Sequence, residues 1–259
     1  PYLFDKGKRA GGRLSTLKLD DREWDFGCPY INATHPDFAQ QARRWVELGW
    51  LAPWSDGPAG ALVGVPTMAS LVANQCADHH VQFLAEVQHV ALHDQKWFLC
   101  GPNLREGPFD AIILALPSEQ AAPLLSLHDL SLAREAAGSR SAPCWSVMVA
   151  FDSPLSTNRN HYHSDGPIAG AFRTNSKPQR QGADTWVIQA SASWSHRHLE
   201  ENADQVAAAL LDHFRGFQSD DLPHYHFLKA HRWRFAHSYG QCGQSLWNTE
   251  LKIGACGDW

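Results

Sequence analysis

Near the start of the chain stands the stretch Tyr2-Leu3-Phe4-Asp5-Lys6-Gly7-Lys8-Arg9-Ala10-Gly11-Gly12-Arg13-Leu14-Ser15-Thr16. Its first three residues predict a short buried strand, and the acidic residue Asp5 follows at the strand's carboxyl end. A carboxylate in that place can accept hydrogen bonds from both hydroxyls of a ribose. A loop with basic residues and a glycine pair comes next, so the stretch predicts a nucleotide-type opening of a mixed α and β fold.

The paired glycines Gly11 and Gly12 would let the backbone pass close to a phosphate or a ring system, because glycine has no Cβ. Arg13 presents a fork of donors that suits phosphate or the edge of a flavin ring, and Ser15 adds a hydroxyl. On spacing alone, an ordinary solvated loop with a chance glycine pair explains the stretch equally well. We therefore treat these four residues, with Asp5, as candidates for binding a cofactor.

The rest of the chain predicts helices and strands in mixed order. Amphipathic spacing predicts helices over 36–48 and 66–75, and Asn202, with Gln205 three residues on, predicts the capped start of a helix that runs to residue 214. A nearly continuous apolar run over 109–116 predicts a central strand buried on both faces. Further predictions are strands over 81–90, 96–100, 145–151, 185–190 and 225–235, and a loop over 49–60.

Composition excludes several classes of protein. The 259 residues are 44% hydrophobic and 19% charged, a globular balance. A net charge of −5, from 22 Lys and Arg against 27 Asp and Glu, argues against a nucleic-acid partner. The longest apolar stretch, 111–117, is too short to cross a bilayer. The six cysteines, Cys242 among them, form no Cys-x-x-Cys pair, which indicates reduced thiols in a cytoplasmic protein.

Fifteen histidines raise the question of a metal site. They include alternating pairs such as His161 and His163, but no acidic or cysteine cluster stands at ligand spacing beside them, so we predict no metal. The acidic residues of the run 21–25, which ends at Asp25, are expected to face solvent. The chain has no Gly-x-Ser-x-Gly elbow and no Gly-x-x-x-x-Gly-Lys loop, so a serine hydrolase and a P-loop nucleotidase are unsupported.

Several segments stand in an order that carries a family resemblance. They are Asp5-Lys6-Gly7, Gly11-Gly12-Arg13-Leu14-Ser15-Thr16, Trp24-Asp25-Phe26-Gly27-Cys28-Pro29-Tyr30, Pro36-Asp37-Phe38, Ala52-Pro53-Trp54, Val63-Gly64-Val65-Pro66-Thr67-Met68, the run 109–117, Pro143-Cys144-Trp145, Asn175-Ser176-Lys177-Pro178, His231-Arg232-Trp233-Arg234 and Cys256-Gly257-Asp258-Trp259. Together they resemble the flavin-containing amine oxidase superfamily, and within it the bacterial renalase-like FAD-dependent oxidoreductases. The resemblance covers nearly the whole chain.

The resemblance implies FAD as cofactor and a flavin-centred reaction for which no catalytic side chain is assigned. It places Asp5 at the adenosine ribose. It places Gly12 and Arg13 at the pyrophosphate and the flavin, with Gly11 shaping the turn. The further cofactor-binding residues that it implies are Gly27 near the isoalloxazine ring, Val87 at the adenine, and Gly257 and Asp258 at the pyrophosphate or ribityl chain.

The resemblance also implies two lobes. A Rossmann-type FAD-binding lobe would comprise residues 1–34, 62–117 and 236–259. A substrate-binding lobe, built on a mixed or antiparallel β-sheet with flanking helices, would comprise residues 35–61 and 118–235. The family's Gly-x-Gly-x-x-Gly unit and a helix after residue 259 are not in the sequence, which opens without Met, so we expect a longer gene product.

The activity implied by the resemblance is hydride transfer from a reduced donor to the flavin, with dioxygen as the oxidant and hydrogen peroxide as the product. The donor would be a small molecule, either a non-standard reduced isomer of a nicotinamide dinucleotide or an amine. No nucleic-acid or membrane partner is expected. The alternative is a non-catalytic, flavin-free remnant or binding module that retains the fold.

Overall fold

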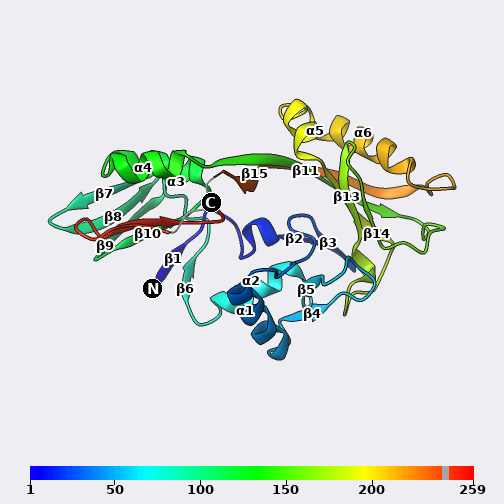
Figure 1. The fold of residues 1–259 in the computed structure, drawn as a ribbon, viewed down its shortest axis with the longest axis horizontal. Helices are drawn as coiled ribbons and strands as arrows, with labels where there is room; N and C mark the ends of the chain where they lie inside the picture. Colours follow the sequence, from blue (N-terminus) through cyan, green and yellow to red (C-terminus); the bar gives the residue numbers. More distant parts are fainter. Residues whose placement is uncertain (241–244) are drawn as a thin grey trace. The chain divides into compact units, whose positions relative to one another are not determined.

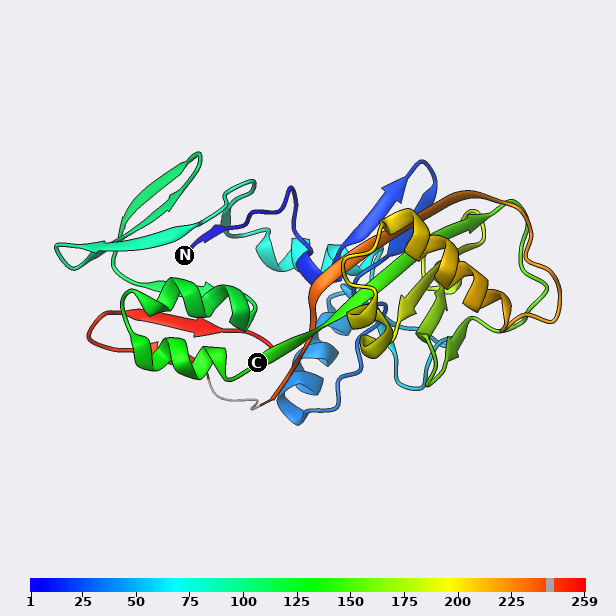
Figure 2. The same ribbon diagram turned by 90° about the horizontal axis from the view of Figure 1, so that it is seen from above.

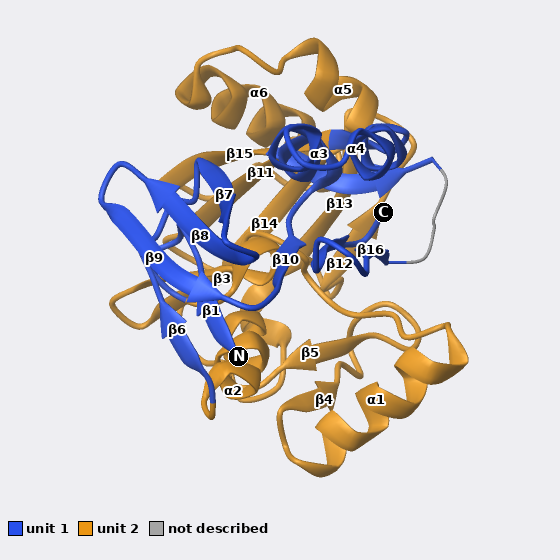
Figure 3. Ribbon diagram, turned by 90° about the vertical axis from the view of Figure 1, so that its left-hand side faces the viewer, with its two compact units in different colours: residues 1–9, 79–142, 234–259 blue, residues 10–78, 143–233 orange. Residues whose placement is uncertain are grey.

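The computed structural model describes residues 1–240 and 245–259, so Cys242 lies outside the described residues. The chain forms two compact units (Figure 3): unit 1 comprises residues 1–9, 79–142 and 234–259, and unit 2 comprises residues 10–78 and 143–233. These units differ from the expected lobes, because residues 10–34 and 62–78 belong to unit 2, and residues 118–142 belong to unit 1. The assignment of cofactor and substrate to separate lobes stays a prediction.

Unit 2 is built on a sheet with the strand order β12-β13-β14-β11-β15. Its strands are β11 (Arg140–Phe151), β12 (His161–His163), β13 (Ile168–Arg173), β14 (Thr185–Ala190) and β15 (Tyr225–Tyr239). The pairs β12–β13, β13–β14 and β11–β14 are antiparallel. The strands predicted over 145–151, 185–190 and 225–235 are therefore confirmed.

The side chains of β11 alternate between two buried layers. Val147 and Val149 pack against buried residues of α5 (Ala192–Arg197) and α6 (Ala203–Arg215). Figure 1 shows these two helices lying over one face of the sheet. Met148 packs on the other face with Trp24, whose indole Nε1 donates to the Val149 carbonyl oxygen at 3.0 Å. The predicted start of α6 is confirmed, because the Asn202 Oδ1 accepts a hydrogen bond from the Asp204 amide at 2.8 Å.

The remaining elements of unit 2 are short. They are the 3₁₀ turns η1 (Gly12–Leu14) and η2 (Thr174–Ser176), the hairpins β2 (Thr16–Leu19) with β3 (Arg22–Asp25) and β4 (Leu51–Pro53) with β5 (Leu62–Gly64), and the helices α1 (Pro36–Glu47) and α2 (Met68–Cys76). Both predicted helices are present, and α2 begins later than predicted because Thr67 caps it. Strand β4 corrects the prediction of a loop over 49–60, since its three residues pair with β5.

Unit 1 contains two parallel strand pairs. β1 (Tyr2–Phe4) pairs with β6 (His80–Gln82), and β10 (Ile112–Ala115) pairs with β17 (Ile253–Cys256). β17 also pairs with β16 (Leu246–Asn248). A third, antiparallel sheet has the order β7 (His89–His93), β8 (Lys96–Gly101) and β9 (Leu104–Phe109), and α3 (Ser118–Ser126) and α4 (Leu130–Ala137) lie side by side (Figure 2).

Three sequence-based strands in unit 1 need correction. β1 forms where predicted but is not buried, because Tyr2 and Leu3 are exposed on this short edge pair with β6. The predicted strand 81–90 divides into β6 and β7, because Leu84 adopts a left-handed φ of 57° and its amide donates to the Gly7 carbonyl oxygen. The run 109–116 is not buried on both faces: in β10, Ile112 is buried but Ile113 is 65% exposed. The described helices lack a segment of the length and apolar character that spanning a membrane requires.

The aromatic core under α6 yields a test of the fold. Phe214 is fully buried, with its ring 5.2 Å from that of Trp186. Truncating a buried phenylalanine removes apolar contacts and leaves a cavity, so we expect Phe214→Ala to lower the free energy of unfolding by about 3–5 kcal/mol. Leu48→Ala, at a side chain that is 51% exposed, is the control, with an expected change of about 0.5 kcal/mol or less. Equal urea midpoints for the two variants would contradict this core.

Candidate cofactor site

In unit 2, the glycine-pair loop folds into a tight turn. Gly11 and Gly12 have φ angles of 142° and 50°, which glycine adopts without the strain that other residues incur. The Leu14 amide donates to the Gly11 carbonyl oxygen at 2.8 Å, and the Ser15 hydroxyl donates to the Gly12 carbonyl oxygen at 2.6 Å. A Cβ added at Gly12 would meet no described atom within 4 Å beyond its chain neighbours, so this backbone is open to close approach.

The turn packs directly against the segment that begins at Gly27. A Cβ added at Gly27 would lie 2.0 Å from the Arg13 carbonyl oxygen, so only glycine fits there. The Cys28 amide donates to the same oxygen at 2.7 Å, which locks the two segments together. The structure therefore brings five of the predicted cofactor-binding residues into one place, namely Gly11, Gly12, Arg13, Ser15 and Gly27.

A buried carboxylate connects these two segments. Asp25 ends β3, two residues before Gly27, and is fully buried, so the expectation that it faces solvent is wrong. Its Oδ1 accepts hydrogen bonds from the Thr16 hydroxyl at 2.7 Å and from the Met68 amide at 3.2 Å. Its Oδ2 lies 2.8 Å from the Lys177 Nζ and 2.5 Å from the Arg180 Nη1.

Asp25, Lys177 and Arg180 form a buried cluster of charged side chains, in which the carboxylate attracts both cations. Burial raises the pKa of the Asp25 carboxyl, but the charges of Lys177 and Arg180, together with the hydrogen bonds from Lys177 and Thr16, outweigh burial and lower that pKa to about 2. Burial lowers the pKa of the Lys177 ammonium to about 8, against the attraction of Asp25. At neutral pH the carboxylate is therefore ionised, with two cations bound to one of its oxygens.

The two cations also reach neighbouring backbone. Lys177 donates to the Pro29 carbonyl oxygen at 2.6 Å, and its Nζ lies 5.4 Å from the centroid of the Trp54 ring. Arg180 donates from Nε to the Pro66 carbonyl oxygen at 3.0 Å, just before the Thr67 cap of α2. The cluster thus fixes three segments of unit 2: the hairpin β2–β3, the stretch after Gly27, and the start of α2.

In unit 1, Asp5 lies where the sequence predicts, at the carboxyl end of β1. Its carboxylate accepts a hydrogen bond from the Gly7 amide at 2.7 Å. Its own amide donates to the Gln82 carbonyl oxygen, and its carbonyl oxygen accepts from the Ala85 amide. Asp5 therefore lies beside the segment that follows β6. Val87, further along this segment, is partly buried.

Gly257 and Asp258 follow β17, the central strand of the mixed sheet β10-β17-β16 of unit 1. A Cβ on Gly257 would lie 2.3 Å from the Trp259 Nε1, and that indole donates to the Leu116 carbonyl oxygen at the end of β10. The Asp258 Oδ2 accepts from the Ser238 amide at 3.4 Å. Asp5 thus follows the parallel strand β1, and Gly257 and Asp258 follow β17, which pairs in parallel with β10. Val87 lies in the segment between β6 and β7 and packs against the hydrophobic core of unit 1.

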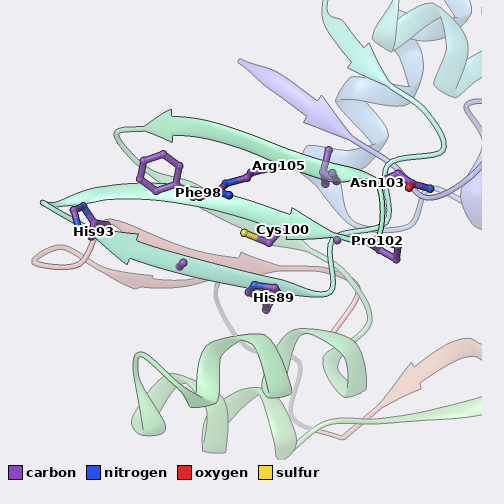
Figure 4. A pocket seen from close by; sticks show the side chains of 10 residues that line it. His89, His93, Phe98, Cys100, Pro102, Asn103 and Arg105 are labelled. Atoms are coloured by element: carbon purple, nitrogen blue, oxygen red, sulfur yellow. The ribbon is translucent and has the colours of Figure 1, made fainter.

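A separate hollow of about 880 Å³ lies on one face of the β7-β8-β9 sheet (Figure 4). Its polar lining includes His89, His93 and Arg105, and it contains none of the predicted cofactor-binding residues. It therefore does not belong to the candidate site. Within residues 1–240 and 245–259, no three His, Cys, Asp or Glu side chains gather as a metal ion would require.

Comparison with known proteins identifies solved structures that have a similar fold. No family model matches the chain. A protein from Exiguobacterium sp. 255-15 assigned as a protoporphyrinogen oxidase matches 87% of the chain with a TM-score of 0.61 and 14% identity. Cyclohexylamine oxidase from Brevibacterium oxydans IH-35A matches 77% with a TM-score of 0.58 and 14% identity. The chain shares its fold with these two proteins, and the predicted mixed α/β class is confirmed.

A third match is an oxidoreductase from Methanosarcina mazei, with a TM-score of 0.52 and 13% identity over 77% of the chain. The chain covers 53%, 48% and 50% of the three matched chains, so it spans about half their length. At such identities the likeness shows a shared fold. Activity and substrate are therefore argued below from the residues of this chain.

Sequence reasoning missed the cations that bind Asp25. Lys177 and Arg180 lie about 150 residues away in the chain, and no local spacing relates them to the β2–β3 hairpin. The one available signal was the segment Asn175-Ser176-Lys177-Pro178, which carried the family resemblance without a role. A buried partner of this kind becomes visible only when the fold brings the segments together.

The lowered pKa of Asp25 yields a test in acid. The folded-state pKa of about 2 lies below the ordinary value of 3.8, so the ionised carboxylate stabilises the fold above about pH 4, and this stability is lost as the pH falls through about 2. The shift corresponds to about 2 kcal/mol. Asp25→Asn breaks a buried ion pair, so near pH 6 we expect its free energy of unfolding to be about 3–5 kcal/mol lower than that of the parent.

That difference should narrow as the pH is lowered from 5 toward 2.5, measured by urea unfolding. Asp20→Asn is the control, because its side chain is 73% exposed on the same hairpin. A constant difference between the parent and Asp25→Asn across this pH range would show that folding does not lower the pKa of Asp25 and would contradict the assignment.

Proposed function

We propose that the chain is part of an FAD-dependent oxidoreductase of the renalase-like type, and that it holds both the cofactor and the substrate. The observation that carries the proposal is the Gly11–Ser15 turn, locked against Gly27 within a fold that known oxidases share. Such a turn exposes backbone at the place where the family resemblance expects the pyrophosphate and the flavin.

The residues present fit FAD in two respects. The open backbone at Gly12, which precedes Arg13 in the chain, suits a pyrophosphate, which needs close approach and a cation. The Asp5 carboxylate is oriented by the Gly7 amide at the end of a parallel strand pair, which suits the two hydroxyls of a ribose. Val87, Gly257 and Asp258 would complete the contacts to the adenine and the pyrophosphate or ribityl chain.

Bound FAD would take up a hydride from the donor and pass the two electrons to dioxygen, which with protons gives hydrogen peroxide. The residues of this chain would bind and orient the donor and exclude competing reactions. We propose a non-standard reduced nicotinamide dinucleotide or an amine as the donor. We further propose a cytoplasmic protein with no nucleic-acid partner, which the net charge of −5 supports.

The visible absorbance spectrum tests the proposal. Purified protein is mixed with FAD, passed through a gel-filtration column and measured between 300 and 550 nm, roughly the range of flavin bands. Two flavin bands that co-elute with the protein support the proposal. Protein that elutes colourless contradicts it and favours the flavin-free alternative.

The ribose contact assigned to Asp5 yields a prediction for the flavin-loaded protein. A hydrogen bond from a hydroxyl to a carboxylate contributes about 1.5–3 kcal/mol, so Asp5→Ala should weaken FAD binding about 10- to 100-fold. The measurement is a fluorescence titration of FAD. Asp78→Ala, at an exposed acid outside the predicted site, is the matched control and should bind as the parent does. Equal affinities for all three proteins would remove Asp5 from this role.

A further inference from the structure

We infer that Lys177 is a positioning residue: held by Asp25, it anchors the Pro29 carbonyl and so sets the place of the segment Cys28–Tyr30. The consequence for the flavin ring rests on the proposed function, which puts this segment beside the isoalloxazine. The anchoring itself is a property of unit 2 alone and can be tested without cofactor.

The Lys177 ammonium contacts two oxygens at once. Its Nζ lies 2.8 Å from the Asp25 Oδ2 and 2.6 Å from the Pro29 carbonyl oxygen. The Lys177 side chain is 1% exposed and that of Asp25 is fully buried, so water does not compete for either contact. Two of the three ammonium hydrogens are thereby directed at oxygens from different segments, and the Trp54 ring faces the charge.

Neutralising Asp25 does not require Lys177. Arg180 already pairs with the carboxylate, and Thr16 and the Met68 amide donate to it as well. A second buried cation leaves one carboxylate against two positive charges, and an uncompensated buried charge is costly. The hydrogen bond to Pro29 comes from Lys177, whereas Arg180 donates to the carbonyl oxygens of Pro66 and Gly64.

The anchored segment connects to the rest of the candidate site. Pro29 lies between Cys28, whose amide donates to the Arg13 carbonyl oxygen, and Tyr30, whose carbonyl oxygen accepts from the Cys28 thiol at 2.9 Å. Releasing Pro29 would therefore loosen the contact with the Arg13 turn and uncover the thiol. Burial raises the pKa of the Cys28 thiol, so in the intact protein the thiol stays protonated and reacts slowly.

The test is the rate at which iodoacetamide alkylates Cys28, measured by peptide mass spectrometry without added FAD. We expect Lys177→Met to raise this rate at least tenfold, while the thermal unfolding midpoint moves by about 3 °C or less, because methionine also removes the surplus buried charge. Arg180→Met, which removes the other cation but leaves the Pro29 contact, should raise the rate far less. Lys18→Met is the control, since Lys18 is 65% exposed on β2.

An alkylation rate in Lys177→Met equal to that of the parent overturns the inference. Equal rates in Lys177→Met and Arg180→Met overturn it too, because the cluster would then act only as a structural unit. If Lys177→Met does not fold, Lys177→Arg replaces it: this variant keeps the charge but changes the reach to Pro29, and should also alkylate faster. A rate like the parent's in Lys177→Arg would mean that charge alone is required.

A second readout separates this inference from the proposed function. With FAD added, the parent should show slower Cys28 alkylation, and Lys177→Met should show a shifted flavin spectrum or weaker FAD binding. If neither protein binds FAD, the proposed function fails while the difference in alkylation still supports the anchoring. If both bind FAD with identical spectra and alkylate alike, the anchoring fails while the proposed function stands.

Discussion

The buried carboxylate of Asp25 is the constraint on which the candidate site in unit 2 depends. A buried charge must be compensated by partners in good geometry, and those partners come from four places: Thr16 in β2, the start of α2, Lys177 and Arg180. Satisfying one side chain therefore fixes the relative positions of segments far apart in the sequence. Trp24, buried under β11, fixes the hairpin from the other side.

The two halves of the candidate site in unit 2 meet through the backbone. The Arg13 carbonyl oxygen is held by the Cys28 amide and lies so close to Gly27 that a side chain there would displace it. Backbone contacts of this kind hold a loop rigidly while leaving Gly12 open to a ligand. A rigid turn with exposed backbone can bind a cofactor without the entropic cost of ordering itself first.

The sequence predicts those helices and strands whose formation depends on neighbouring residues. The strand ending at Asp5, the helix that Asn202 caps and the buried strand over 185–190 follow from apolar spacing and capping residues. Phe83–Gln88 was misread because Leu84 turns back to bond the loop after β1, a tertiary choice that propensity does not encode. The prediction for Asp25 was wrong for the same reason. A run of acidic residues predicts exposed side chains, and only the fold shows that the distant cations Lys177 and Arg180 allow this carboxylate to be buried.

Anaerobic reduction of the flavin-loaded protein tests the central claim most directly. A reduced nicotinamide dinucleotide, including its non-standard isomers, or an amine is mixed with the protein under nitrogen, and the long-wavelength flavin band is followed. We expect the band to bleach with one of these donors and to return in air, with one hydrogen peroxide formed for each donor consumed. A flavin band that persists with every donor of both classes would contradict it.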